Sequence, residues 1–199
     1  MTVCVQGLWH LGTVTAACLA SRGITTVGLA ETAEAAAELG AGKAPLFEPG
    51  LDDLLTQGLA DKTLSFTHDV AAAVSGADLL WVNFDTPVDD NDMADIGYVL
   101  DRVRAAFPYL KDGAVVMISS QVPVGSTAQL ERDFAGVANG RRVSFAYSPE
   151  NLRLGDAIRV FTKSERIVDG KKRCTKCSEV KPVSEFNRRA DRPIGIVAQ

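Results

Sequence analysis

The chain has 199 residues, of which 46% are hydrophobic and 23% charged, and its formal net charge is −4. This composition is typical of a globular α/β domain, and the length suffices for one full hydrophobic core with a small appendage. The sequence has no apolar run of the roughly 20 residues that a transmembrane helix needs, and no basic start followed by a signal core, so we expect a cytoplasmic protein.

Residues 1–31 predict a strand, a glycine turn, a helix and a second strand, with the regular segments over residues 2–5, 13–21 and 24–29. In the dinucleotide fingerprint G-x-G-x-x-G, the first glycine forms the turn, the second lets the pyrophosphate approach, and the third allows close helix–strand packing. Gly7 and Gly12 hold the first and third places, and Trp9 fills the middle one. We expect the Trp9 ring either to push a bound cofactor outward or to swing aside and stack near it.

The predicted cofactor-binding turn consists of Gly7, Trp9, His10, Leu11 and Gly12. The start of its helix offers free N–H groups and a partial positive charge for a phosphate. His10 either adds a donor there or is a satisfied or solvent-facing histidine, which is the commoner outcome. Glu31 lies about 20 residues beyond the turn, where an acid takes the ribose hydroxyls and disfavours a 2′-phosphate. The sequence therefore favours NAD over NADP.

Helical and strand patterns alternate through the following hundred or so residues. Helix-forming or amphipathic segments predict helices over residues 32–39, 51–59, 69–75, 96–107 and about 126–136. Apolar runs predict strands over residues 63–66, 77–84, 114–119 and 142–147. The run over residues 77–84 is nearly continuously apolar, so we expect it to be buried on both faces in the middle of a parallel sheet. Glu48 stands in a proline-punctuated loop and is expected to be solvated rather than to face a ligand.

This alternation predicts a Rossmann-like α/β fold, a six-strand doubly wound parallel sheet flanked by helices and joined by right-handed connections. In such sheets the ligand binds beyond the carboxyl ends of the strands. Polar residues follow several of the predicted strands, namely Thr86, Ser119, Ser120, Gln121 and Glu150. We expect these residues and the glycine turn to form one ligand-binding edge.

Six segments carry a resemblance to a known family: GLWHLG, GKAPLFEPGLDDLL, TPVDDNDMADIGYV, SSQVPVGST, SPENLRLGDAI and SERIVDG. In this order and spacing they resemble the amino-terminal, NAD-binding domain of the UDP-glucose/GDP-mannose dehydrogenase family, over residues 1–170. Members of that family oxidise the 6-hydroxymethyl group of a nucleotide sugar to a carboxylate in polysaccharide biosynthesis, reducing two NAD molecules. Their reaction passes through cysteine-bound intermediates.

The resemblance implies roles for several residues at the ligand-binding edge. Gly7 and Gly12 would lie under the pyrophosphate of NAD, and Thr86 with Ser120 and Gln121 would border the nicotinamide. The segment that begins at Glu150 would lead towards the sugar of a UDP- or GDP-sugar substrate.

Two positions depart from the family pattern in places that matter for chemistry. Gln121 stands where the family has a threonine, and Leu154 stands where it has an acid. Leucine cannot take part in acid–base chemistry. We expect no complete catalytic set in this chain, in which Gln121 and Glu150 are the candidates for a catalytic contribution. The family's cysteine nucleophile, in a GFGGxCxPKD-like loop, has no counterpart in this sequence. We therefore expect a truncated enzyme that binds NAD and acts on a nucleotide sugar only if the catalytic half is supplied, either as a monomer or as an oligomer.

The composition changes after residue 170. Residues 171–199 hold 8 basic and 3 acidic residues, a net charge of +5, against 13 and 22, a net charge of −9, in residues 1–170. Cys174 and Cys177 form a CxxC pair that resembles half of a zinc knuckle, but two thiolates fill only half of a tetrahedral zinc site. The tail is either a zinc site completed by outside ligands or a flexible basic segment with two thiols. The alternative function is accordingly a non-catalytic binding module whose tail contacts nucleic acid or a partner.

Overall fold

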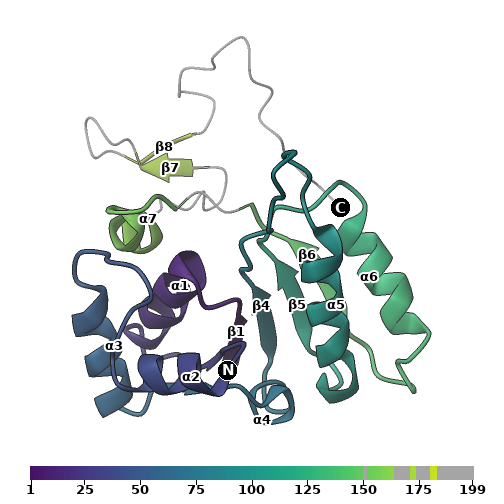
Figure 1. Cartoon of the computed structure of the whole chain (residues 1–199), viewed down its shortest axis with the longest axis horizontal. Coiled ribbons are helices and arrows are strands. Elements are labelled where there is room, and N and C mark those ends of the chain that lie inside the picture. The colour runs from purple at the N-terminus through teal and green to yellow at the C-terminus, as the bar shows by residue number, and fades with distance from the viewer. Residues whose placement is uncertain (150–151, 164–170, 174–179, 183–199) are drawn as a thin grey trace. The chain divides into compact units, whose positions relative to one another are not determined.

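The computed structural model describes residues 1–149, 152–163, 171–173 and 180–182 (Figure 1). The chain divides into two compact units, Met1–Thr162 and Lys163–Gln199. The predicted domain boundary near residue 170 falls outside the described residues and stays a prediction. In the second unit, β7 (Lys171–Arg173) pairs antiparallel with β8 (Val180–Pro182).

The first unit is built on a six-stranded sheet in which every neighbouring pair of strands is parallel. The strand order is β3-β2-β1-β4-β5-β6, which is the order of a doubly wound dinucleotide-binding fold. The strands are β1 (Thr2–Gln6), β2 (Thr25–Leu29), β3 (Leu64–Thr67), β4 (Leu79–Val82), β5 (Val115–Ile118) and β6 (Ser144–Tyr147). The predicted six-strand Rossmann-like sheet is confirmed.

Helices appear at each predicted position with ends that differ by a few residues, and a further helix over Ala157–Lys163 was not predicted. They are α1 (His10–Ala20), α2 (Ala33–Gly40), α3 (Leu51–Ala60), α4 (Val70–Val74), α5 (Ile96–Ala106), the short 3₁₀ helix η1 (Phe107–Tyr109), α6 (Ser126–Ala135) and α7 (Ala157–Lys163). Three of them begin at a polar cap whose side chain accepts a backbone N–H: Thr32 for α2, Asp69 for α4 and Asp95 for α5. No helix in the described part of the chain is long and apolar enough to span a membrane.

The hydrophobic core has two parts, one on each face of the sheet. In β1, Val3 and Val5 belong to the part that contains α1 and α3, whereas Cys4 belongs to the part that contains α4, α5 and α6. Figure 1 shows α1, α2 and α3 beside the β1 half of the sheet, and α5 and α6 beside the half that contains β5 and β6. Because side chains alternate along a strand, both faces of β1 are covered.

Strand β4 lies in the middle of the sheet as predicted, between β1 and β5. Its Leu80 and Val82 are fully buried, but Leu79 and Trp81 on the opposite face are only half-buried. The prediction that this strand is buried on both faces is therefore wrong for one of them. On that face the covering elements include α7, whose Phe161 ring lies 6.1 Å from the Trp81 ring.

Candidate functional site

The turn between β1 and α1 requires glycine at two places. Gly7 adopts φ +89°, and a Cβ atom there would lie 2.6 Å from the backbone nitrogen of Phe84. A Cβ atom on Gly12 would lie 1.9 Å from the carbonyl oxygen of Gly7, so helix α1 packs directly against the turn. Both glycines thus have the structural roles expected of the first and third positions in a dinucleotide-binding turn.

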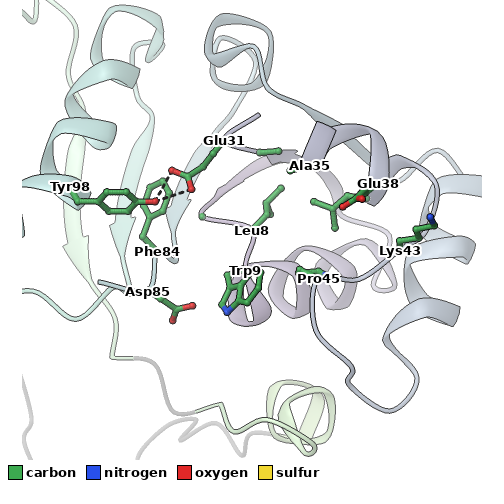
Figure 2. A pocket seen from close by; sticks show the side chains of 13 residues that line it. Leu8, Trp9, Glu31, Ala35, Glu38, Lys43, Pro45, Phe84, Asp85 and Tyr98 are labelled. Carbon is green, nitrogen blue, oxygen red and sulfur yellow. Dashed lines mark hydrogen bonds between the residues drawn. The ribbon is translucent and has the colours of Figure 1, made fainter. Parts of the chain in front are cut away.

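Trp9 occupies the middle position with a negative φ of −78°, and it is the amino-terminal cap residue of α1. The side chain is 52% exposed. Its ring points towards Asp85 at the edge of a pocket in Figure 2. The first turn of α1 carries no acidic side chain, so its free N–H groups and partial positive charge remain suited to an anion.

The pocket that Trp9 borders has a volume of about 550 Å³ and opens at the carboxyl ends of β1, β2 and β4 (Figure 2). A cleft of this size suits a ligand as large as a nucleoside. Its lining includes Gly7, Leu8 and Trp9 from the turn, Ala30 and Glu31 after β2, Leu39 from α2, Lys43 and Pro45 beyond α2, Phe84 and Asp85 after β4, and Tyr98 from α5.

Glu31 is fixed in the wall of this pocket by two residues of α5. The hydroxyl of Tyr98 donates to both carboxylate oxygens at 2.7 and 2.8 Å, and Nε of Arg102 donates to one of them at 2.5 Å. Burial, followed by the nearby Glu31 carboxylate, raises the pKa of Tyr98 to about 12, so the phenol stays protonated and remains a donor. The sequence predicted the position of Glu31 on the ligand-binding edge but not these two partners.

A second pocket of about 240 Å³ lies at the carboxyl ends of β4 and β5. It brings together Thr86, Ser120 and Gln121, which the sequence placed at one edge, and its lining also includes Leu11, Asn83, Asp85, Ser119, Tyr147 and Leu152. The Thr86 hydroxyl donates to the carbonyl oxygen of Gln121 at 2.6 Å, which ties the loop after β4 to the loop after β5. Among the described residues, the buried hydroxyl of Ser120 and the buried side-chain amide of Asn83 find no hydrogen-bond partner.

Asp85 lines both pockets and was not predicted as a site residue. Partial burial raises the pKa of its carboxyl group, an effect that His10 opposes. The Asp85 side chain is nevertheless exposed, at the point where the two pockets meet. The signal for Asp85 in the sequence was its place directly after the apolar run over residues 77–84, beside Thr86.

His10 is buried and does not face either pocket as a free donor. Its Nε2 atom lies 2.9 Å from Oε2 of Glu48, which is itself only 4% exposed. Glu48 also accepts the backbone N–H groups of Gly155 at 2.6 Å and Ala157 at 2.9 Å. Burial by itself raises the pKa of Glu48, but these three hydrogen bonds outweigh it and hold the pKa below its usual range.

The prediction that Glu48 is solvated is therefore wrong. Its carboxylate joins three segments, because it binds the first residue of α1 and the backbone at the start of α7. His10 corresponds to the satisfied histidine that the sequence left open as the alternative to a phosphate ligand.

The cysteines fall into two groups. Cys4 and Cys18 are buried free thiols, and burial raises the pKa of Cys4 to about 12 and that of Cys18 to about 11. Such thiols carry almost no thiolate and do not act as nucleophiles. Cys174 and Cys177, the weak candidates for a metal site, lie outside the described residues.

Two further positions discussed from the sequence are Glu150, in the segment that the resemblance directs towards the sugar, and Leu154. Glu150 lies outside the described residues, so the structure does not place this candidate. Leu154, which stands where the family pattern has an acid, is 62% exposed.

Comparison with known proteins places the chain in a family. The family model for the UDP-glucose/GDP-mannose dehydrogenase family, NAD-binding domain, matches residues 1–185, which extends into the segment that contains the CxxC pair. UDP-glucose 6-dehydrogenase of Pseudomonas aeruginosa is 32% identical over 174 residues, which cover 85% of this chain and 38% of that protein. UDP-N-acetyl-D-mannosamine dehydrogenase of Methanococcus maripaludis is 27% identical over 172 residues, covering 84% of this chain and 38% of that protein.

Solved structures agree with this placement. GDP-mannose dehydrogenase from Pseudomonas aeruginosa, in a ternary complex, superposes with a TM-score of 0.74 at 28% identity and covers 81% of this chain. A UDP-glucose dehydrogenase from Pyrobaculum islandicum superposes with a TM-score of 0.72 at 32% identity and covers 80% of this chain. In both cases the match spans 38% of the other chain, so this sequence corresponds to a little more than a third of its relatives' length.

Proposed function

The chain belongs to the UDP-glucose/GDP-mannose dehydrogenase family and carries its NAD-binding domain, and on that premise we propose how its own residues hold the cofactor. Glu31 in the 550 Å³ pocket would take the ribose hydroxyls of the adenosine half of NAD. The Gly7–Gly12 turn at the start of α1 would hold the pyrophosphate, and Thr86 and Ser120 in the 240 Å³ pocket would border the nicotinamide.

One observation carries this proposal. The two glycines hold a turn so tight that a Cβ atom on Gly12 would overlap the Gly7 carbonyl, and this turn lines the pocket on whose wall Glu31 is fixed. The residues present fit the cofactor, because Trp9 has an ordinary φ and its ring borders the pocket. Trp9 thus supports the outcome in which the ring lies beside the cofactor, with the indole available to stack on it.

Bound NAD supplies a hydride acceptor for the oxidation of an alcohol carbon. The residues of this chain orient that acceptor. The Thr86 hydroxyl donates its proton to the Gln121 carbonyl, so it ties together the two loops that would border the nicotinamide and does not itself move a proton. Gln121 carries an amide, which orients a ligand by hydrogen bonds but does not act as a base. Glu150, which lies outside the described residues, stays a candidate for a catalytic contribution from the sequence.

The whole reaction is a proposal, since the chain spans about 38% of the length of the relatives it matches. We infer that the domain works in an enzyme that oxidises the 6-hydroxymethyl group of a UDP- or GDP-sugar to a carboxylate. The cysteine nucleophile then comes from a region other than Cys4 and Cys18, whose thiols are buried. The oligomeric state, a cytoplasmic location and the alternative role of the Cys174/Cys177 tail in zinc or nucleic-acid binding stay predictions from the sequence.

Calorimetric titration of the chain with NAD tests the cofactor site directly. We expect saturable binding at one site, weakened by Glu31→Ala. Glu131→Ala is the matched control, because it removes an exposed carboxylate on α6 that lines neither pocket. Equal loss of binding in both variants would show that charge in general, and not a ribose contact, governs the affinity.

A further inference from the structure

The carboxylate of Glu31 is held by two residues one helical turn apart. Tyr98 and Arg102 are spaced i, i+4 on α5, so their side chains lie on the same face of the helix. The Arg102 guanidinium lies over the Tyr98 ring, with Cζ 3.4 Å from the ring centroid, and Nη1 donates to the Tyr98 carbonyl at 3.2 Å. Stacking and hydrogen bonds thus orient the guanidinium towards Glu31.

Glu31 separates two cavities. It lines the 550 Å³ pocket together with Tyr98, and it also lines a neighbouring cavity of about 250 Å³ together with Arg102. Gln6 and His68 belong to the lining of this smaller cavity. Gln6 is buried, and its Oε1 atom finds no hydrogen-bond partner among the described residues.

The smaller cavity therefore contains one permanent cation, one histidine and one buried amide, and Glu31 supplies its negative charge. With the ribose on Glu31, a 2′-phosphate would extend past this carboxylate towards Arg102. In dinucleotide-binding folds an arginine near the ribose accommodates the 2′-phosphate of NADP, in place of the acid that binds the ribose hydroxyl of NAD. Here the Arg102 guanidinium already donates to the Glu31 carboxylate at 2.5 Å, so it is not free to bind a 2′-phosphate.

We propose that Arg102 is a specificity-determining residue that Glu31 masks: while Glu31 is charged the site takes NAD, and without that charge Arg102 binds the 2′-phosphate of NADP. This inference rests on the proposed cofactor site and goes beyond it by assigning the choice of cofactor to an acid–arginine pair. Tyr98 is a positioning residue, because it holds the Glu31 carboxylate without carrying a charge of its own.

Calorimetry with NAD and with NADP on the wild type and four variants tests the proposal. Glu31→Gln keeps the shape of the side chain and removes its charge, and Glu31→Ser is a second variant with the same expected effect. For both we expect NADP to bind on the order of 10 to 100 times more tightly than it binds the wild type, because a repulsion between close like charges is removed. Raising the salt concentration should weaken this NADP binding more than NAD binding.

The remaining variants separate the roles of the two partners. In Glu31→Gln combined with Arg102→Gln, the gain in NADP affinity should disappear. Tyr98→Phe should weaken NAD binding without admitting NADP, because the charge of Glu31 stays in place. Circular dichroism melts confirm that each variant is folded before its affinities are compared.

Two results would overturn the proposal: unchanged NADP affinity in both Glu31 variants, or a gain that persists when Arg102 is also replaced. Either result, in a protein whose wild type binds NAD, leaves the cofactor site itself intact. A folded wild-type chain that binds neither nucleotide would instead refute the proposed function.

Discussion

Replacing Glu48 by glutamine should strongly destabilise the fold, although the two side chains have the same shape. The carboxylate accepts three hydrogen bonds, two on Oε2 from His10 and Gly155 and one on Oε1 from Ala157. An amide keeps one acceptor oxygen and turns an NH₂ group towards at least one of these donors. At least one buried donor then loses its partner and faces another donor.

The magnitude follows from burial. Glu48 is 4% exposed, so solvent cannot replace the lost interactions. Removing one partner from a buried, charged hydrogen-bond network typically costs about 3–5 kcal/mol. We expect the free energy of unfolding of Glu48→Gln to fall by about 3 kcal/mol, a large fraction of the roughly 5–15 kcal/mol that stabilises an ordinary domain.

Urea unfolding followed by circular dichroism measures this change. Glu131→Gln, on an exposed position of α6, is the matched control and should change the free energy by less than about 0.5 kcal/mol. His10→Gln should also destabilise, and the double variant should lose less than the sum of the single losses because the residues share one network. A Glu48→Gln variant as stable as the control would refute the account of this buried carboxylate.

The same network predicts a pH dependence. The pKa of Glu48 is lowered in the folded state, so its contribution is complete above the ordinary glutamate pKa of about 4.3 and is lost as the pH falls through the lower, folded value. The stability of the wild type should therefore fall more steeply in acid than that of Glu48→Gln.

Three further predictions concern the glycine turn and the edge of the two pockets. Asp85→Asn should tighten NAD binding several-fold at neutral pH, as measured by calorimetry, because it removes a carboxylate that would repel the pyrophosphate where the two pockets meet. Unchanged affinity would place Asp85 away from the pyrophosphate. Gly12→Ala should lower the melting temperature, because its methyl carbon would lie 1.9 Å from the Gly7 carbonyl oxygen, and a wild-type melt would contradict the tight turn. Thr86→Val should weaken NAD binding by roughly 2- to 10-fold, because it removes a hydrogen bond of about 1 kcal/mol that orders the loop of Gln121. The control Thr127→Val lies outside both pockets and should leave NAD binding unchanged.

The sequence predicted the sheet well because its signals are local. Each predicted strand is an apolar run between turn residues, and each appears in the structure with ends that differ by a few residues. The glycine turn was also predictable, since Gly7 and Gly12 are identified by spacing alone. The error at β4 arose because an apolar run does not tell whether a neighbouring element covers Leu79 and Trp81.

The parts of the site that were missed depend on long-range contacts. Glu48 reaches His10 across 38 residues and Ala157 across 109, and no periodic pattern connects these positions. Tyr98 and Arg102 likewise lie 67 and 71 residues from Glu31. On the sequence alone they are polar positions of an amphipathic helix, and only the fold brings these two side chains of α5 to the acid that follows β2.

The most direct test of the central claim is the thermal unfolding of the chain with NAD and, separately, with NADP. NAD at 100 times its dissociation constant should stabilise the folded state by about 2.7 kcal/mol if it binds only that state, and NADP at the same concentration should add much less. A cooperative melt that shifts with NAD and not with NADP would support a cofactor site at the Gly7–Gly12 turn with Glu31 on its wall. A cooperative melt that neither nucleotide shifts would contradict it.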